Sequence, residues 1–219
     1  MIDRARSHTV VLFIAVLLGN PAPVQSADAE GKSPRELVRI GMEEFRAGKI
    51  DESIKSFEHA ARLQPNLRPE LWQLGISYYY AGEYSKGREL FEAHQKVNPQ
   101  DVENAIWHFL CAVKTGGIET ARAKFITITQ DRRVPMKELH RLFAGKGSKE
   151  QVLEAAQKGD EADRKNQMFY AYLYLSLYEE ALGKAEESLK LIRRAAGEFG
   201  QSHYMGDVAR VHLKRREGE

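Results

Sequence analysis

The sequence contains a single cysteine, Cys111, among 219 residues. An intramolecular disulfide is therefore excluded, and we expect packing alone to stabilise the fold. An excess of charge of either sign is also missing, because 33 lysines and arginines face 31 acidic residues and the net charge is +2. Proteins that bind nucleic acid present a basic surface. The charge balance therefore predicts no nucleic-acid partner.

The short motifs of common enzyme classes are absent too: the sequence has no HExxH, no GxSxG, no P-loop and no glycine-rich dinucleotide motif. His108 and Cys111 are three residues apart on a predicted helix and are a candidate pair of metal ligands. A zinc site needs three or four ligands, and His108 falls at a predicted core position. We therefore predict no catalytic residue, no metal and no cofactor. An envelope hydrolase, or another enzyme whose site is assembled from scattered residues, is the alternative.

A long apolar run is also lacking, since the segment from Thr9 to Leu18 is too short to span a bilayer comfortably. Arg4 and Arg6 precede this run, and the small residues of VQSADA follow it, as in a cleaved secretory signal. We expect a signal peptide at residues 1–26 and a flexible linker at 27–33. The mature chain is then expected to be periplasmic or secreted, without a stable membrane span. No cysteine follows the run to accept the lipid of a bacterial lipoprotein.

Two segments of the chain align at an offset of 34 residues: IGMEEFRAGKIDESIKSFEHAARLQP from Ile40 and LGISYYYAGEYSKGRELFEAHQKVNP from Leu74. The residues that coincide are Gly41 with Gly75, Gly48 with Gly82, Phe57 with Phe91, and Pro65 with Pro99. The same offset reaches Gly116 and Phe125, and Gly183 lies 67 residues after Gly116, one short of two periods. A small residue lets paired helices approach closely, and a glycine with positive φ ends the first of them. The pattern predicts a repeat array.

Both the period and the residue types resemble the tetratricopeptide repeat. This resemblance implies an all-α solenoid of antiparallel helix pairs with a C-terminal capping helix. The expected domain covers 34–219, with repeats at about 34–67, 68–101 and 102–134, a degenerate unit at 135–168, a repeat at 169–201 and a capping helix at 202–216. Phe109 stands where the third repeat should have its first-helix glycine, so we expect that pair to splay. Within the degenerate unit we expect two short helices, Met136 to Phe143 and Lys149 to Gln157.

The segment from Phe169 to Phe199 is in addition similar to NlpI-type tetratricopeptide proteins of the bacterial cell envelope, through its helix order and its FY…YLSL…G motif. Those proteins are adaptors that dimerise and bring proteases and peptidoglycan hydrolases together. The resemblance implies a non-catalytic interaction scaffold with protein or peptide partners, and a possible homodimer. The chain departs from that family because it lacks the lipidated cysteine.

An apolar and aromatic stripe runs along the first helices of the repeats, on the face that stacked repeats turn toward their concave side. This stripe is a candidate peptide groove, and its predicted residues are Val38, Arg39, Met42, Phe45, Trp72, Ile76, Tyr79, Tyr80, Ile106 and Leu110. The alternative is that these side chains contact neighbouring helices and cover a core. Tyr78, within the run of three tyrosines, is expected in the core under either interpretation.

Overall fold

The computed structural model describes residues 31–218. The predicted signal peptide and most of the predicted linker lie outside the described residues. The chain divides into two units, Met1–Gly31 and Lys32–Glu219, and the second contains every helix discussed below. Throughout the described part, the regular secondary structure is helical. None of these helices has the length and apolar character needed to cross a membrane.

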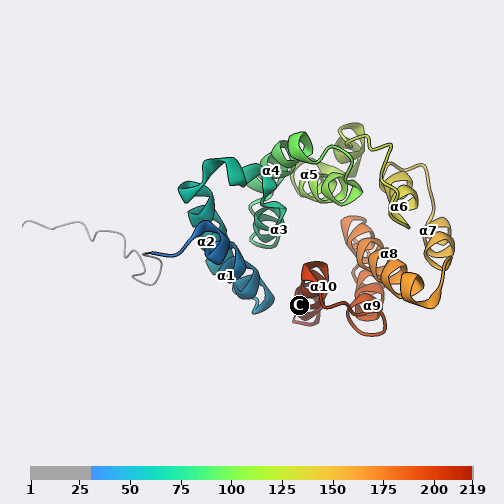
Figure 1. Cartoon of the computed structure of the whole chain (residues 1–219). Coiled ribbons are helices and arrows are strands. Elements are labelled where there is room, and N and C mark those ends of the chain that lie inside the picture. Colours follow the sequence, from blue (N-terminus) through green and yellow to red (C-terminus); the bar gives the residue numbers. More distant parts are fainter. Residues whose placement is uncertain (1–30, 219) are drawn as a thin grey trace, which may run out of the picture. The chain divides into compact units, whose positions relative to one another are not determined.

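Consecutive helices form antiparallel pairs along the chain, drawn in sequence colours in Figure 1. Their bounds are α1 Pro34–Arg46, α2 Ile50–Leu63, a 3-10 helix Pro65–Glu70, α3 Trp72–Tyr80, α4 Tyr84–Val97, α5 Val102–Ala123, α6 Met136–Phe143, α7 Lys149–Ala156, α8 Glu161–Ala181, α9 Ala185–Ala196 and α10 Tyr204–Glu217. The prediction of an all-α solenoid of helix pairs is confirmed. The short helix α6 has the predicted bounds, and α7 ends one residue before the predicted Gln157.

The glycines of the first two repeats have the expected roles. A Cβ atom on Gly41 would lie 2.9 Å from the ring of Phe57, and one on Gly75 would lie 2.6 Å from the ring of Phe91. Each phenylalanine therefore fills the space that the missing side chain leaves between paired helices. Gly82, which ends α3, has a φ of 80°, a conformation that other residues adopt only with strain. The 34-residue pattern thus reports helix packing and helix termination.

The third repeat departs from the expected geometry. The residue with positive φ is Gly117, at 77°, one position after the Gly116 that the alignment selected. Helix α5 kinks there and ends at Ala123, so the second helix of this repeat is reduced to a short segment. Phe109 replaces the small residue, and its ring meets that of Phe125 edge to face at 5.6 Å. Residues 124–135 continue as an irregular segment, and the splaying of this pair stays a prediction.

The C-terminal helix packs against α9, as expected of a cap, and also against α1. Tyr204 at its start lies 5.3 Å, between ring centroids, from both Phe45 in α1 and Trp72 in α3. Arg46 at the end of α1 donates a hydrogen bond to Asp207 in α10. The last helix of the array therefore contacts the first, which the sequence pattern did not predict.

Candidate functional site

Most of the predicted groove is core. Six of the ten predicted residues are no more than 6% exposed: Phe45, Ile76, Tyr79, Tyr80, Ile106 and Leu110. Helix α10 covers part of this face, because it brings Tyr204 onto Phe45 and places Nδ1 of His212 at 3.2 Å from the hydroxyl of Tyr80. The burial of all six side chains in the core corrects the prediction that they line an open groove. Tyr78, expected in the core, is fully buried.

The other four predicted residues keep some exposure. Val38 and Met42 are half-buried on α1, and Arg39 is exposed there and forms an ion pair with Glu43 at 2.6 Å. Trp72, half-buried at the start of α3, is the one among the ten that lines the cavity described next. The structure therefore does not bring the predicted set together into one binding surface.

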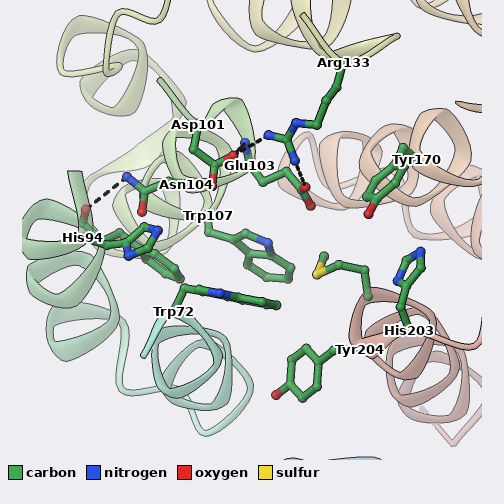
Figure 2. A pocket seen from close by; sticks show the side chains of 12 residues that line it. Trp72, His94, Asp101, Glu103, Asn104, Trp107, Arg133, Tyr170, His203 and Tyr204 are labelled. Carbon is green, nitrogen blue, oxygen red and sulfur yellow. Dashed lines mark hydrogen bonds and ion pairs between the residues drawn. The ribbon is translucent and has the colours of Figure 1, made fainter. Parts of the chain in front are cut away.

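A cavity of about 330 Å³ lies where α3, α4, α5, α8 and α10 converge, next to the irregular segment before α6. It is lined by Trp72, Phe91, His94, Asp101, Glu103, Asn104, Trp107, Arg133, Tyr170, His203, Tyr204 and Met205. Figure 2 shows the two tryptophans on one side and Tyr170 with His203 on the other, with Arg133 above them. Sequence reasoning missed most of this set because the residues come from separate segments that share no motif.

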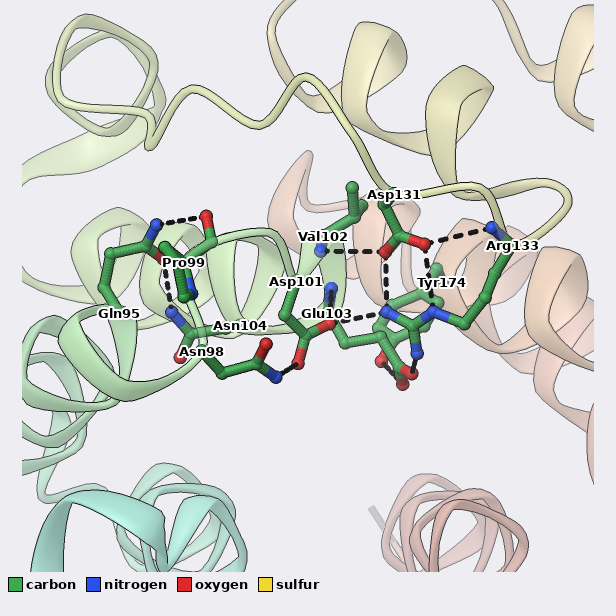
Figure 3. A network of polar contacts seen from close by, with 10 residues as sticks. All are labelled: Gln95, Asn98, Pro99, Asp101, Val102, Glu103, Asn104, Asp131, Arg133 and Tyr174. Atoms are coloured by element: carbon green, nitrogen blue, oxygen red, sulfur yellow. Dashed lines mark hydrogen bonds and ion pairs between the residues drawn. The ribbon is translucent and has the colours of Figure 1, made fainter.

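Arg133 organises the acidic wall of the cavity, shown in Figure 3. Its guanidinium donates at 2.6 Å to Glu103, Asp101 and Asp131. The other carboxylate oxygen of Glu103 accepts a hydrogen bond from the hydroxyl of Tyr174 in α8 at 2.5 Å. Three carboxyl groups thus share one arginine, and the network joins α5, α8 and the irregular segment.

The carboxyl groups of this network have different electrostatic environments. Burial raises the pKa of Glu103 to about 7, against the opposing effect of the Arg133 guanidinium. Burial also acts to raise the pKa of Asp131, but hydrogen bonds from Arg133 and from the amide of Val102 lower it overall. Burial lowers the pKa of His203 across the cavity, so this histidine is mainly neutral near pH 7. Arg133 is then the principal positive charge of the lining.

Three buried polar atoms of the cavity wall have no hydrogen-bond partner among the described residues. They are Nε1 of Trp107, whose residue is 2% exposed, Oδ1 of Asn104, whose residue is 3% exposed, and the hydroxyl oxygen of Tyr204, whose residue is 7% exposed. The amide nitrogen of Asn104 donates to the Phe91 carbonyl at 3.1 Å and to Gln95 at 2.9 Å. A buried unpaired donor or acceptor costs about 1–3 kcal/mol. One donor and one acceptor are therefore left on neighbouring turns of α5.

A second cavity of about 170 Å³ has a different character. It is lined by Tyr79, Tyr80, Tyr84, Lys114, Glu180, His212, Arg215 and Arg216. Lys114 donates to Glu180 at 3.1 Å, and the guanidinium of Arg215 lies 5.7 Å from the ring centre of Tyr80. Tyr79, which lines this cavity, has its ring 5.4 Å from that of Trp107, which lines the first one.

The described residues contain no group of three or more histidine, cysteine or acidic side chains placed to hold a metal ion. His108, the proposed partner of Cys111, instead has its Nε2 at 3.2 Å from a carboxylate oxygen of Glu92. Cys111 is fully buried, and burial raises the pKa of its thiol to about 12. The thiolate that a metal would need is therefore strongly disfavoured.

No protein-family model matches the sequence, and no curated protein matches it either. Solved structures do match, among them one titled "MamA RS-1 ArsTM double mutant". That structure is 18% identical to this chain, and the match covers 87% of this chain and 92% of the other at a TM-score of 0.38. The helix-pair architecture is established here by the packing of this chain's own glycines and phenylalanines.

Proposed function

We propose that the protein is a non-catalytic interaction scaffold that binds peptide segments of cell-envelope proteins in the cavity between Trp72 and Tyr170. The observation that carries this proposal is the composition of the cavity wall: aromatic rings from α3, α5, α8 and α10 surround buried polar atoms that lack partners. Aromatic residues supply most of the binding energy in protein interfaces, and unpaired polar groups at their edge select the ligand.

The proposal is tested by selecting peptides from a random display library against the full chain. We expect the selected peptides to lose at least about tenfold in affinity for the Trp72→Ala variant, because an aromatic anchor is removed. Val97→Ala is the matched control, since Val97 is a hydrophobic residue that is 50% exposed at the end of α4. Peptides that bind the Trp72→Ala variant as well as the parent protein would place the partner on another surface and contradict the proposal.

A hydrolase is the second candidate, and one observation favours it. Glu103 has a pKa of about 7 and lies beside Asp101 in a cavity, which is the environment of a general acid. Both oxygens of Glu103 are already engaged, however, by Arg133 and by Tyr174. A general acid must direct its proton at the substrate, so the scaffold is the better supported function. Soluble fragments released from cell-wall material by the parent protein, and not by Glu103→Gln, would reverse this preference.

Export is part of the same proposal. It is supported by the first 26 residues, in which two arginines are followed by an apolar run and then by small residues. Protein recovered from the periplasm or medium should begin at or near Ala27, as measured by intact mass. The similarity of Phe169 to Phe199 to NlpI-type proteins further supports envelope partners and a homodimer. Sedimentation of the purified chain tests the dimer, and a monomer at all concentrations would remove it from the proposal.

A further inference from the structure

The charge and the hydrogen-bonding groups of the cavity identify the kind of peptide that it accepts. We infer that the cavity receives a basic side chain, lysine or arginine, from a partner peptide, and that the peptide group of that residue pairs with Trp107 and Asn104. This inference rests on the proposed function and names the chemistry of its partner. Three independent features of the wall lead to it: its charge, its aromatic faces and its unpaired polar atoms.

The charge of the wall favours a cation. Asp101, Glu103 and Asp131 share a single resident cation, Arg133, which donates to all three at 2.6 Å. The side chains of Asp101 and Glu103 are only 18% and 14% exposed, so bulk water screens them weakly. Even with Glu103 partly protonated near pH 7, the carboxylates outnumber the one guanidinium, so an incoming ammonium or guanidinium group would be attracted and an acidic side chain repelled.

The aromatic faces suit the same ligand. Trp72, Trp107, Tyr170 and Tyr204 all line the cavity. A cation near the face of an aromatic ring is attracted by the ring's electrons, most strongly by those of tryptophan. The hydrocarbon stem of lysine or arginine also covers apolar surface while the charged group remains at a polar site. The cavity therefore offers apolar contact along the stem and carboxylates at the charged end.

The unpaired atoms distinguish a peptide from a small cation. Nε1 of Trp107 is a donor only, and Oδ1 of Asn104 is an acceptor only. A simple ammonium ion has no acceptor to offer Trp107. A peptide group carries one carbonyl and one N–H, which match the donor of Trp107 and the acceptor of Asn104 in kind. The hydroxyl of Tyr204, also unpaired, can donate or accept and so fits either end of a peptide group. Trp107 and Asn104 are three residues apart on α5, so both atoms lie on one helix face.

The two tryptophans of the whole chain, Trp72 and Trp107, both line this cavity, so intrinsic fluorescence reports its occupancy. The probe is the tripeptide acetyl-Gly-Lys-Gly-amide. The same peptide with arginine, with Nε-acetyl-lysine or with glutamate in the middle position serves for comparison. We expect saturable fluorescence changes with the lysine or arginine peptide, and affinity at least about tenfold lower for the acetylated peptide, which has lost only its charge.

Glu103→Gln should lower the affinity for the lysine peptide at least about tenfold, because the substitution removes one carboxylate and keeps the shape of the side chain. Glu119→Gln is the matched control on the same helix, with a side chain that is 84% exposed, and it should bind normally. Circular dichroism verifies that each variant is folded. Trp72→Phe, which keeps an aromatic ring but weakens the cation contact, gives a second test if Glu103→Gln is unstable.

Equal affinity for the lysine and acetyl-lysine peptides, or a preference for glutamate, would overturn the inference. The inference would also be overturned if no tripeptide bound while the display-selected peptides still depended on Trp72. That result would leave the proposed scaffold function intact. If the selected peptides also bind independently of Trp72, the proposed function fails together with this inference.

Discussion

Arg46 in α1 donates from Nε to Oδ2 of Asp207 in α10 at 2.9 Å, and 161 residues of sequence separate the two. The side chain of Asp207 is 1% exposed, and its second oxygen accepts from Arg210 at 2.5 Å. Arg46 and Arg210 keep about half of their surface exposed. A buried carboxylate with two exposed arginines thus connects the first helix of the array to the last.

Asp207→Asn should therefore destabilise the fold more than Arg46→Ala. Asparagine loses the negative charge and one of the two acceptor oxygens, and it turns an amide N–H₂ toward one of the two guanidinium groups; a hydrogen bond to a charged group is worth about 1.5–3 kcal/mol. Arg46→Ala, in contrast, leaves Asp207 paired with Arg210. Urea unfolding of the two variants measures the difference. Equal losses of stability, or a larger loss for Arg46→Ala, would show that Arg210 does not hold the carboxylate.

Gly75→Ala should destabilise the second repeat by about 1–3 kcal/mol, because the new Cβ would lie 2.6 Å from the ring of Phe91. Phe91→Leu alone should also cost stability by leaving a gap. The double variant should be more stable than the sum of the two losses predicts, since the smaller leucine leaves room for the methyl group. Thermal melts of the four proteins measure this coupling, and strict additivity would contradict the proposed contact.

Glu103 should make the stability depend on pH. Because its pKa in the folded chain is about 7 and the ordinary value is 4.5, the folded state holds the proton more tightly. The stability from this group is fully present below pH 4.5 and is lost as pH rises through 7, by up to about 3 kcal/mol. The groups that act on it are Arg133, Asp101 and Tyr174. The difference in unfolding free energy between the parent and Glu103→Gln should therefore vary over this range and become constant above it.

Tyr79→Ala should destabilise the chain about as much as Tyr78→Ala, by about 3 kcal/mol or more, because both side chains are buried. Trp72→Ala should cost less, since Trp72 is half-buried at the cavity. Circular dichroism melts of the three variants give the comparison. If the Tyr79→Ala variant had the same melting temperature as the parent protein, Tyr79 would have to lie on an accessible surface.

The helix pairs were predictable because their determinants are local. Gly75 and Phe91 meet within one repeat, and an offset of 34 residues is sufficient to recognise that contact twice in the sequence. Gly117 was missed by one residue because Gly116, which lies beside it, fits the 34-residue offset. The period alone therefore selects the wrong one of two adjacent glycines, and the positive φ identifies Gly117.

The candidate site was largely unpredictable for the opposite reason. In the sequence, Glu103 is an ordinary acidic residue in the first turn of a helix, and Arg133 is one charged residue in a loop. Their contact depends on the irregular course of residues 124–135, which no repeat pattern encodes. The aromatic stripe was recognised, but Phe45 and Tyr80 within it are covered by α10, which begins more than a hundred residues further along the chain.

The contact between α10 and α1 also bears on how the protein unfolds. In an open repeat array each unit touches only its neighbours, so the terminal units can fray while the middle stays folded. Here the terminal helices stabilise each other through Asp207 and through the ring contact of Phe45 with Tyr204. Neither end can detach without exposing the other, and we therefore expect the helices of residues 34–217 to unfold in one cooperative transition.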